Sequence, residues 1–260
     1  MELRDKVAIV TGSGGGGCGR TIARRFAREG AAVVVCDIDE EGGGETVRLI
    51  GADRGRAAFL RADVSAEADV RALIAFAEQK YGGLDLLVNN ASGPYRPEAP
   101  LDYWAETVGV ELLGTMYATR HALEPMRRRG GGAIVSMSSI SSLGHGRKHS
   151  ASPAYDVAKA GVIRLTTTLG RLQEEMNIRV NCLVPGWIAS PPVKAYWDGL
   201  TPEQRRERGV PDELISLDGI ANVVVRLATD ASLAGRAMVW WNCEPPRLIS
   251  RGDPGYVTLE

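Results

Sequence analysis

The sequence predicts an α/β protein, with one parallel sheet wound in both directions from its centre and helices on both faces. Short apolar runs rich in valine, isoleucine and leucine alternate with longer amphipathic stretches along the 260 residues. A run that is apolar throughout is typical of a strand covered on both faces. No linker-like or repetitive segment divides the chain, so we expect residues 1–260 to form a single domain.

The apolar runs expected as strands are Val7–Val10, Ala32–Val35, Ala57–Leu60, Leu84–Val88, Ala133–Met137, Arg179–Val184 and Ala237–Trp240. The amphipathic stretches expected as helices are Arg20–Glu29, Glu67–Lys80, Leu101–Arg129, Pro153–Met176 and Leu217–Thr229. Ligands of such sheets bind beyond the carboxyl ends of the strands, so the residues that follow each run are the first candidates for a site.

The stretch Ile188–Pro211 interrupts this alternation, because it is too long for a turn and too weakly periodic for one helix. It follows the end of a strand, so we expect a substrate lid over residues 188–215; a structural excursion between helices is the alternative. Residues 241–260, which begin Trp241-Asn242-Cys243, are expected to form a C-terminal extension.

The charge balance gives no reason to expect a nucleic acid or an anionic membrane as a partner. The chain has 31 basic and 32 acidic residues, and its net charge is −1. It has no signal-peptide pattern and no membrane-spanning apolar run. The cysteines lack the spacing of a zinc site, so we expect no metal, buried reduced thiols and a cytoplasmic location.

A glycine-rich loop, Gly12–Gly19, joins the first expected strand to the first expected helix. Glycines in this context allow a tight turn and a close backbone approach to a pyrophosphate at the helix N-terminus. A flexible surface loop is one alternative. A P-loop is another: Gly14–Thr21 fits that pattern except that Arg20 replaces the lysine, and a planar guanidinium substitutes poorly for that ammonium.

Asp37 ends the second expected strand, 18 residues after Gly19. A carboxylate at this place can accept hydrogen bonds from both ribose hydroxyls of an adenosine and would repel a 2′-phosphate. The sequence therefore favours NAD over NADP as the cofactor. The alternative is that Asp37 only begins the next turn, with Asp39 or Glu40 capping a helix.

Tyr155 and Lys159 are one helical turn apart, and Ser139 follows the strand Ala133–Met137. Oxidation of an alcohol requires removal of its hydroxyl proton while a hydride leaves carbon. A free tyrosine has a pKa near 10, and a neighbouring ammonium favours the phenolate, so we expect Lys159 to lower the pKa of Tyr155. A serine hydroxyl beside the tyrosine can hydrogen-bond the substrate oxygen.

With these features in order, and Asn89-Asn90-Ala91 between them, the chain resembles the short-chain dehydrogenase/reductase family from residue 5 to about residue 240. The resemblance implies a Rossmann-type fold and the catalytic set Ser139, Tyr155 and Lys159. The cofactor contacts that it implies are Gly12, Gly17, Cys18, Gly19, Asp37, Ile38, Asp63, Val64, Asn90, Ala91, Tyr155, Lys159, Pro185, Gly186, Ile188 and Ser190.

In this resemblance, Asp63 and Val64 would flank the adenine, and Lys159 would also hold the nicotinamide ribose. Asn90 and Ala91 would line the cofactor channel. Pro185–Ser190 would contact the nicotinamide half, with Ser190 in place of the usual threonine.

The chain departs from the family pattern at several places. The glycine loop has one extra residue between Gly12 and Gly17, and the usual C-terminal glycine pair is missing. Glu111 stands where the family has a helix asparagine that supports a proton-relay water. An ionised carboxylate accepts hydrogen bonds but donates none, so a relay at Glu111 would have to work differently.

These observations predict an NAD(H)-dependent oxidoreductase that interconverts a secondary alcohol and a ketone, a small-molecule substrate. The alternatives are a cofactor-binding redox sensor without catalysis, and a non-redox epimerase or lyase on the same scaffold. Trp187, Tyr196, Trp197 and Tyr95 could form a pocket for a ring-bearing substrate, although aromatic residues are more often core. By resemblance, a homo-oligomer, a tetramer or a dimer, is expected.

Overall fold

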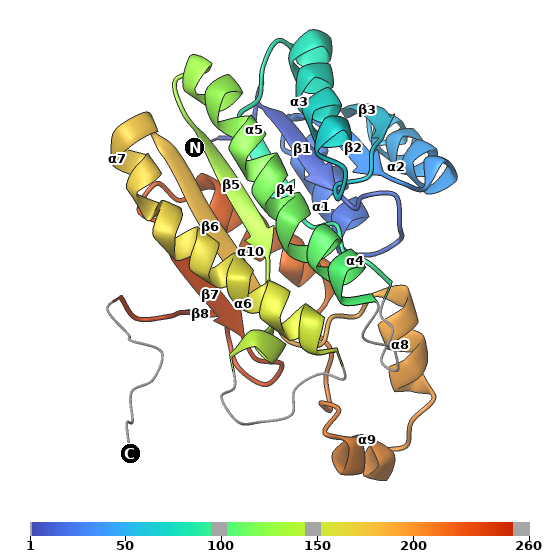
Figure 1. The fold of residues 1–260 in the computed structure, drawn as a ribbon. Coiled ribbons are helices and arrows are strands. Elements are labelled where there is room, and N and C mark those ends of the chain that lie inside the picture. Colours follow the sequence, from blue (N-terminus) through green and yellow to red (C-terminus); the bar gives the residue numbers. More distant parts are fainter. Residues whose placement is uncertain (1, 95–102, 144–151, 252–260) are drawn as a thin grey trace.

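An eight-stranded sheet forms the centre of the computed structural model, which describes residues 2–94, 103–143 and 152–251. The strand order is β3-β2-β1-β4-β5-β6-β7-β8, so the chain winds outward in both directions from β1 and β4 (Figure 1). Strands β1 to β7 pair in parallel, and β8 is antiparallel to β7. The predicted doubly wound parallel sheet is confirmed.

The eight strands begin and end within a few residues of their predicted limits, except the last, which was not predicted. They are β1 (Val7–Thr11), β2 (Ala32–Asp37), β3 (Arg56–Arg61), β4 (Leu86–Asn89), β5 (Gly132–Met137), β6 (Ile178–Pro185), β7 (Arg236–Trp240) and β8 (Arg247–Leu248). The helices that cover the sheet are α1 (Cys18–Arg28), α2 (Glu40–Ala52), α3 (Glu67–Tyr81), α4 (Trp104–Val108), α5 (Gly114–Arg128), α6 (Pro153–Thr168), α7 (Leu172–Met176) and α10 (Leu217–Thr229).

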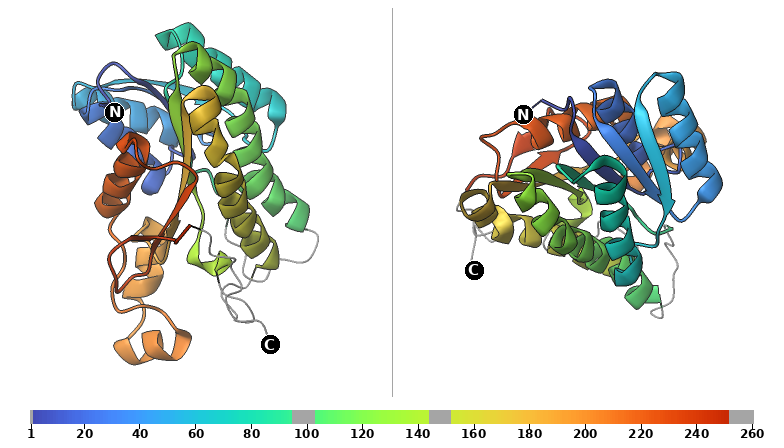
Figure 2. Two further views of the ribbon diagram at one scale, coloured as in Figure 1. Left: turned by 90° about the vertical axis from the view of Figure 1, so that its left-hand side faces the viewer. Right: turned by 90° about the horizontal axis from the view of Figure 1, so that it is seen from above.

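Apolar cores fill the space on both sides of the sheet. Alternate residues of β1 point to opposite faces: Ala8 and Val10 join α1 and α10, whereas Val7 and Ile9 join α3 and α5. Figure 2 shows the sheet edge-on between these two helical layers. Coverage of both faces explains why each strand of the centre is apolar throughout.

Two long stretches predicted as single helices are interrupted. The described part of Leu101–Arg129 consists of α4, a π-helical turn η2 (Gly109–Leu113) and α5. Pro153–Met176 consists of α6, a short 3₁₀ turn and α7. A π turn carries one extra residue per turn and is frequent at functional sites.

The segment after β6 contains two short helices, α8 (Pro191–Asp198) and α9 (Pro202–Arg208). A proline lies in the first turn of each, and Thr201 forms a capping box with Gln204 at the start of α9. The helices extend beyond the carboxyl ends of the strands, at the bottom of Figure 1. This arrangement explains why the segment lacks a single helical period.

The cysteine prediction is right for two thiols and wrong for Cys243, which is exposed. Cys36 and Cys182 are buried, Cys18 is partly buried, and all four are free. Burial raises the pKa of the Cys182 thiol to about 12 and that of Cys18 to about 11. Within the described ranges, no helix is long and apolar enough to cross a membrane.

The chain after β7 returns to the base of the α8–α9 segment. Asn242 accepts a hydrogen bond from the Trp187 N–H at 2.9 Å and donates to the carbonyls of Trp187 and Glu213 at 2.7 and 3.0 Å. Gly186 leaves room for this contact, because a Cβ there would lie 2.2 Å from the Asn242 Oδ1. The C-terminal part of the chain therefore fixes the junction between β6 and α8 through one amide side chain.

Replacing Asn242 with Ala removes all of these hydrogen bonds and leaves the Trp187 N–H without its partner, whereas the Trp187 carbonyl keeps the Ile215 N–H. We expect a loss of about 1–3 kcal/mol in the free energy of unfolding, measured by urea denaturation. Glu244→Ala is the matched control in the same turn, because its ion pair with Arg247 is exposed. An equal effect of the two substitutions would contradict the role given to Asn242.

Candidate active site

The glycine-rich loop is held against the end of β4 by a network around Thr11. The Thr11 hydroxyl accepts hydrogen bonds from the backbone N–H groups of Asn90 and Ala91 at 3.0 and 3.1 Å. The Asn90 amide donates to the carbonyls of Thr11 and Gly12 at 2.9 and 3.0 Å. The predicted cofactor residues Gly12, Asn90 and Ala91 are therefore adjacent, at the carboxyl edge of the sheet.

The glycines of the loop fall into two groups. Gly12 has a positive φ of 63°, and a Cβ there would lie 2.6 Å from the Ala91 Cα. A Cβ on Gly19 would lie 2.1 Å from the Gly12 carbonyl oxygen. These two glycines are required by close backbone packing at the start of α1.

Gly15, Gly16 and Gly17 have a different environment. A Cβ on Gly15 would have no neighbour within 4 Å. One on Gly16 would meet side-chain atoms of Pro191 at 3.6 Å and Arg20 at 3.9 Å, and one on Gly17 would meet the Ser190 Cβ at 3.8 Å. Open space therefore lies above the N-terminus of α1, whose first turn has no acidic residue. Free N–H groups and the positive end of the helix dipole at such a place suit a pyrophosphate.

Asp37 takes part in the shape of the loop as well as standing at the end of β2. Its Oδ2 accepts a hydrogen bond from the Gly14 N–H at 2.7 Å, and its Oδ1 accepts one from the Asp39 N–H at 3.1 Å. Asp39 also caps α2 through the Gly42 N–H, as the alternative interpretation of this turn expected. The Gly14 contact was not predicted, and it ties the glycine-rich loop to the end of β2.

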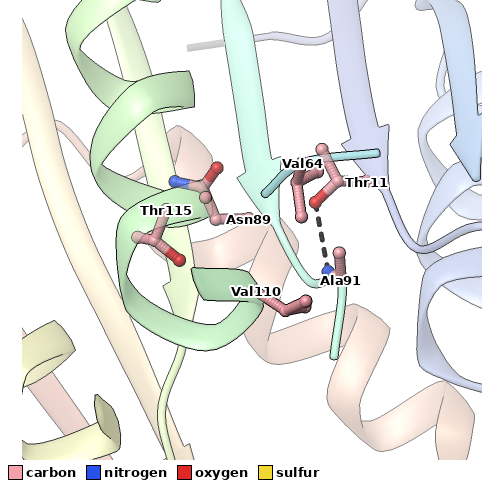
Figure 3. Close-up of a pocket in the computed structure, with 7 residues that line it drawn as sticks. Thr11, Val64, Asn89, Ala91, Val110 and Thr115 are labelled. Carbon is pink, nitrogen blue, oxygen red and sulfur yellow. Dashed lines mark hydrogen bonds between the residues drawn. The ribbon is translucent and has the colours of Figure 1, made fainter. Parts of the chain in front are cut away.

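A small hollow lies between the ends of β1 and β4 and the π turn (Figure 3). Val64 follows β3 and is buried, and Val110 reaches the hollow from η2. The residues that line it are Thr11, Val64, Asn89, Ala91, Val110, Gly114 and Thr115. Val64 and Ala91 are thus brought to one hollow, together with the polar side chains of Thr11, Asn89 and Thr115.

The end of β5 presents two serines with different roles. Ser138 is buried and donates to the Lys159 carbonyl at 2.8 Å, which fastens α6 to the sheet. Ser139 caps the following 3₁₀ turn, because its hydroxyl accepts a hydrogen bond from the Ser141 N–H. The Ser139 side chain also lies within interaction range of the Tyr155 side chain. Ser139 and Tyr155 therefore meet as predicted.

Lys159 lies one turn after Tyr155 on α6 and points into the protein. Its ammonium donates to the Met137 carbonyl at 2.8 Å and lies 5.4 Å from the centre of the Tyr155 ring. The Glu111 carboxylate is its ion-pair partner, with 2.7 Å between Lys159 Nζ and Glu111 Oε2. Glu111 and Lys159 are both buried.

The pKa of Tyr155 is raised above its ordinary value, contrary to the direction expected from the sequence. Burial is the largest cause, because it penalises the phenolate. The Lys159 ammonium does lower this pKa, as expected, but the Glu111 carboxylate opposes it. The spacing of Tyr155 and Lys159 in the sequence reports the ammonium alone, whereas burial and the Glu111 carboxylate depend on the fold.

Glu111 stands where the family has its relay asparagine, and in the structure it has partners besides Lys159. Its Oε1 accepts hydrogen bonds from the Ser92 hydroxyl at 2.5 Å and from the Gly93 N–H at 2.9 Å. Ser92, Gly93 and the Met137 carbonyl were not identified from the sequence. Their positions after β4 and at the end of β5 were the available signal, since both strands end at this edge.

The remaining residues that were predicted to contact the cofactor lie at the ends of strands and at the starts of helices. The Asp63 carboxylate accepts from the N–H and hydroxyl of Ser65, so it closes a local turn. Cys18 begins α1, and Ile38 is 60% exposed beyond β2. Pro185 ends β6, Ser190 precedes α8, and Ile188 bridges to Ile215.

The aromatic residues after β6 form pairs that the structure shows directly. Trp187 and Tyr196 are stacked with ring centres 6.2 Å apart. The Arg205 guanidinium carbon lies 3.3 Å from the centre of the Trp197 ring, and the Trp197 indole N–H donates a hydrogen bond to the Pro211 carbonyl. Tyr95 lies outside the described residues.

Comparisons with known proteins agree with this geometry. The family profile described as short chain dehydrogenase matches residues 6–200. A short-chain dehydrogenase/reductase from Aspergillus oryzae is 36% identical, over 89% of this chain and 91% of its own length. Cis-4-hydroxycyclohexanecarboxylate dehydrogenase from Sinomonas cyclohexanicum is 36% identical, over 88% of this chain and 91% of its own length.

Solved structures show the same fold. A 7α-hydroxysteroid dehydrogenase in complex with NADH and 7-oxo glycochenodeoxycholic acid superposes with a TM-score of 0.81 and 29% identity, covering 92% of this chain and 94% of its own. A short-chain dehydrogenase/reductase structure from Burkholderia xenovorans superposes with the same TM-score and 30% identity, covering 92% and 95%. From the strand order, the site geometry and these matches together, the chain belongs to the short-chain dehydrogenase/reductase family.

Proposed function

We propose that this oxidoreductase interconverts a secondary alcohol and a ketone with NAD(H), using Tyr155 as the general acid and base. The meeting of Ser139, Tyr155 and Lys159 at the carboxyl edge of the sheet carries the proposal. The same edge holds the open glycine loop, on the other side of the β4 end. A redox sensor without catalysis would not need the Ser139 and Tyr155 hydroxyls beside the buried Lys159 ammonium.

In the oxidation direction, the Tyr155 oxygen takes the hydroxyl proton of the alcohol, and the C–O bond becomes a carbonyl as the carbinol C–H bond breaks. The nicotinamide ring of NAD supplies the acceptor for that hydride. Ser139 donates a hydrogen bond to the reacting oxygen and stabilises the charge that develops on it. In the reverse direction, Tyr155 returns the proton. An epimerase or a lyase on this scaffold would give no net change in reduced nicotinamide.

The charges around the end of β2 support a preference for NAD. Asp37, Asp39, Glu40 and Glu41 follow one another within five residues, and none of the described contacts places a basic side chain on Asp37. A 2′-phosphate would meet this cluster of negative charge, whereas ribose hydroxyls could donate to the remaining acceptor sites of Asp37.

The junction between β6 and α8 supports a ring-bearing substrate and a lid over residues 188–215. Gly186 lies against the side chain of Ile140, which follows Ser139 directly, so this junction begins beside the segment that follows β5. The Trp187–Tyr196 stack presents an apolar aromatic surface from that point outward. Two similar proteins are named for cyclic alcohols, a hydroxycyclohexanecarboxylate and a hydroxysteroid.

A homo-oligomer in the cytoplasm is the assembly that we propose. Large apolar side chains are exposed on α4, η2, α5 and α6, the helices that follow one another on one face of the sheet: Trp104, Leu113, Met116 and Val157. Val157 is 65% exposed, two residues after Tyr155. A second copy of the chain, packed by a two-fold axis, would cover this apolar face.

Tyr155→Phe tests the acid–base role. We expect kcat to fall by about 10²–10⁴-fold while the affinity for NADH persists, because the phenyl ring keeps the packing and loses the titrating group. NADH absorbance reports turnover on a panel of cyclic, steroidal, sugar-like and hydroxyacyl secondary alcohols, and NADH fluorescence reports binding. Tyr81→Phe, at the remote end of α3, is the control. Turnover that survives in the Tyr155 variant would refute the assignment.

Asp37→Asn and Asp37→Ala separate charge from loop shape. The asparagine keeps an acceptor for the Gly14 N–H, so it should raise the kcat/KM ratio of NADP to NAD by about tenfold, or about 1.4 kcal/mol, through lost repulsion. The alanine should weaken both cofactors as well, because the loop loses its anchor. An unchanged cofactor ratio in both variants would show that Asp37 is misassigned.

Val157→Glu tests the apolar face. A carboxylate at this exposed position should leave the fold intact and lower the molar mass in solution, measured by light scattering after size exclusion. Glu174→Ala, an exposed change on α7, is the control. A wild-type protein that is monomeric at micromolar concentration would contradict the proposed assembly.

A further inference from the structure

Glu111 and Lys159 form a buried ion pair at the place where, by the family resemblance, a helix asparagine would support a proton-relay water. Glu111 belongs to the π turn η2, and Lys159 belongs to α6. Their side chains retain only 2% and 5% of their possible exposure, and the charged atoms are 2.7 Å apart. The two charges are therefore taken out of water together, in direct contact.

The carboxylate has a second set of partners in the chain after β4. Glu111 Oε1 accepts from the Ser92 hydroxyl and the Gly93 N–H, and both groups follow the cofactor-channel residues Asn90 and Ala91 directly. One carboxylate thus joins the ammonium beside Tyr155 to the chain that lines the cofactor channel. A neutral side chain at position 111 could keep the shape of this bridge but not its charge.

The charge balance around Tyr155 follows from these contacts. The ionisable groups that act on Tyr155 in the described ranges are Lys159 and Asp156 from its own helix and Glu111 from η2. The ammonium favours the phenolate, and both carboxylates disfavour it. Glu111 also stabilises the charged form of Lys159, whose burial alone would lower its pKa. The Glu111–Lys159–Tyr155 cluster is neutral while the tyrosine is protonated.

We infer that Glu111 is a positioning residue that fixes the Lys159 ammonium by a direct ion pair and holds Tyr155 in its protonated, proton-donating form. The inference rests on the proposed function for its catalytic meaning. In the neutral cluster, loss of a proton leaves a net negative charge in a buried place. With a neutral residue at position 111, the cluster begins with one positive charge, so the first proton leaves at lower pH.

This arrangement has a consequence for the reaction. Reduction of a ketone needs the Tyr155 proton, and oxidation of an alcohol needs the phenolate. Glu111 therefore extends the pH range in which ketone reduction is fast to higher pH. It also moves the pH at which alcohol oxidation reaches its full rate in the same direction.

Glu111→Gln tests the inference without cofactor or substrate. Ionisation of Tyr155 is followed by tyrosinate absorbance between about pH 7 and pH 11, a range that brackets the ordinary pKa of tyrosine. The signal of Tyr155 is the difference between each protein and its Tyr155→Phe counterpart. We expect the midpoint in the glutamine variant to lie lower than in the wild type by on the order of one pH unit.

Two controls distinguish the ion pair from other effects. Asp156→Asn removes a carboxylate that follows Tyr155 directly and has no contact with Lys159 among the described residues, and it should shift the midpoint less than Glu111→Gln does. Ser92→Ala removes a hydrogen bond to Glu111 but no charge, and it should leave the midpoint near the wild-type value. Equal midpoints for Glu111→Gln and the wild type, or no Tyr155 ionisation below pH 11 in Glu111→Gln, would overturn the inference.

The rate profile gives a second readout, with an alcohol on which the wild type is active. The apparent pKa of kcat/KM for oxidation should fall in Glu111→Gln, whereas a purely structural role would lower the rate at every pH without moving the profile. Absence of hydride transfer in the wild type would defeat the proposed function and leave the tyrosinate titration to judge the ion pair.

If Glu111→Gln does not fold, the double variant Glu111→Gln/Lys159→Met provides the test. Removal of both charges should restore a folded protein by circular dichroism, because no uncompensated ammonium stays buried. A double variant as unfolded as the single one would contradict the ion pair.

Discussion

A buried ammonium has to be satisfied by acceptors and by an opposite charge, and Lys159 obtains both from parts of the chain that are distant in sequence. The Met137 carbonyl comes from the end of β5, and the Glu111 carboxylate comes from the π turn. Breaking such a pair by removing one partner is strongly destabilising. The positions of α6, of η2 and of the segment after β4 are therefore coupled at the point where Tyr155 meets Ser139.

The π turn gives this coupling its geometry. In an uninterrupted helix, the extra residue of the turn Gly109–Leu113 would not exist, and the side chains before and after it would point in other directions. Glu111 is 2% exposed and faces the sheet edge, whereas Leu113 is 38% exposed on the outer side. The same short turn thus contributes a carboxylate to the site and an apolar side chain to the face that we assign to a second copy.

The fold could be predicted because its signals are local. Each strand from β1 to β7 contains an apolar run bounded by turn residues, and the ends of these runs mark the edge along which Gly12, Asp37, Asn90 and Ser139 lie. The pairing of Glu111 with Lys159 could not be predicted in this way, because it joins residues 48 positions apart through a turn whose helical type has no clear sequence signal. The direction in which the Tyr155 pKa is shifted also depends on burial, and the spacing of Tyr155 and Lys159 in the sequence does not report burial.

The extra glycine-loop residue shows how a departure from a motif is absorbed. The Gly14 N–H binds Asp37, so the longer loop is fixed to the carboxylate that we assign to cofactor choice, while Gly12 and Gly19 keep their close packing. The central claim, hydride transfer at this edge, is tested most directly with carbinol-deuterated cyclic secondary alcohols and NAD. Mass spectrometry of the nucleotide should find deuterium in NADH produced by the wild type. Bound nucleotide that never acquires the label, with or without conversion of the alcohol, would contradict the account.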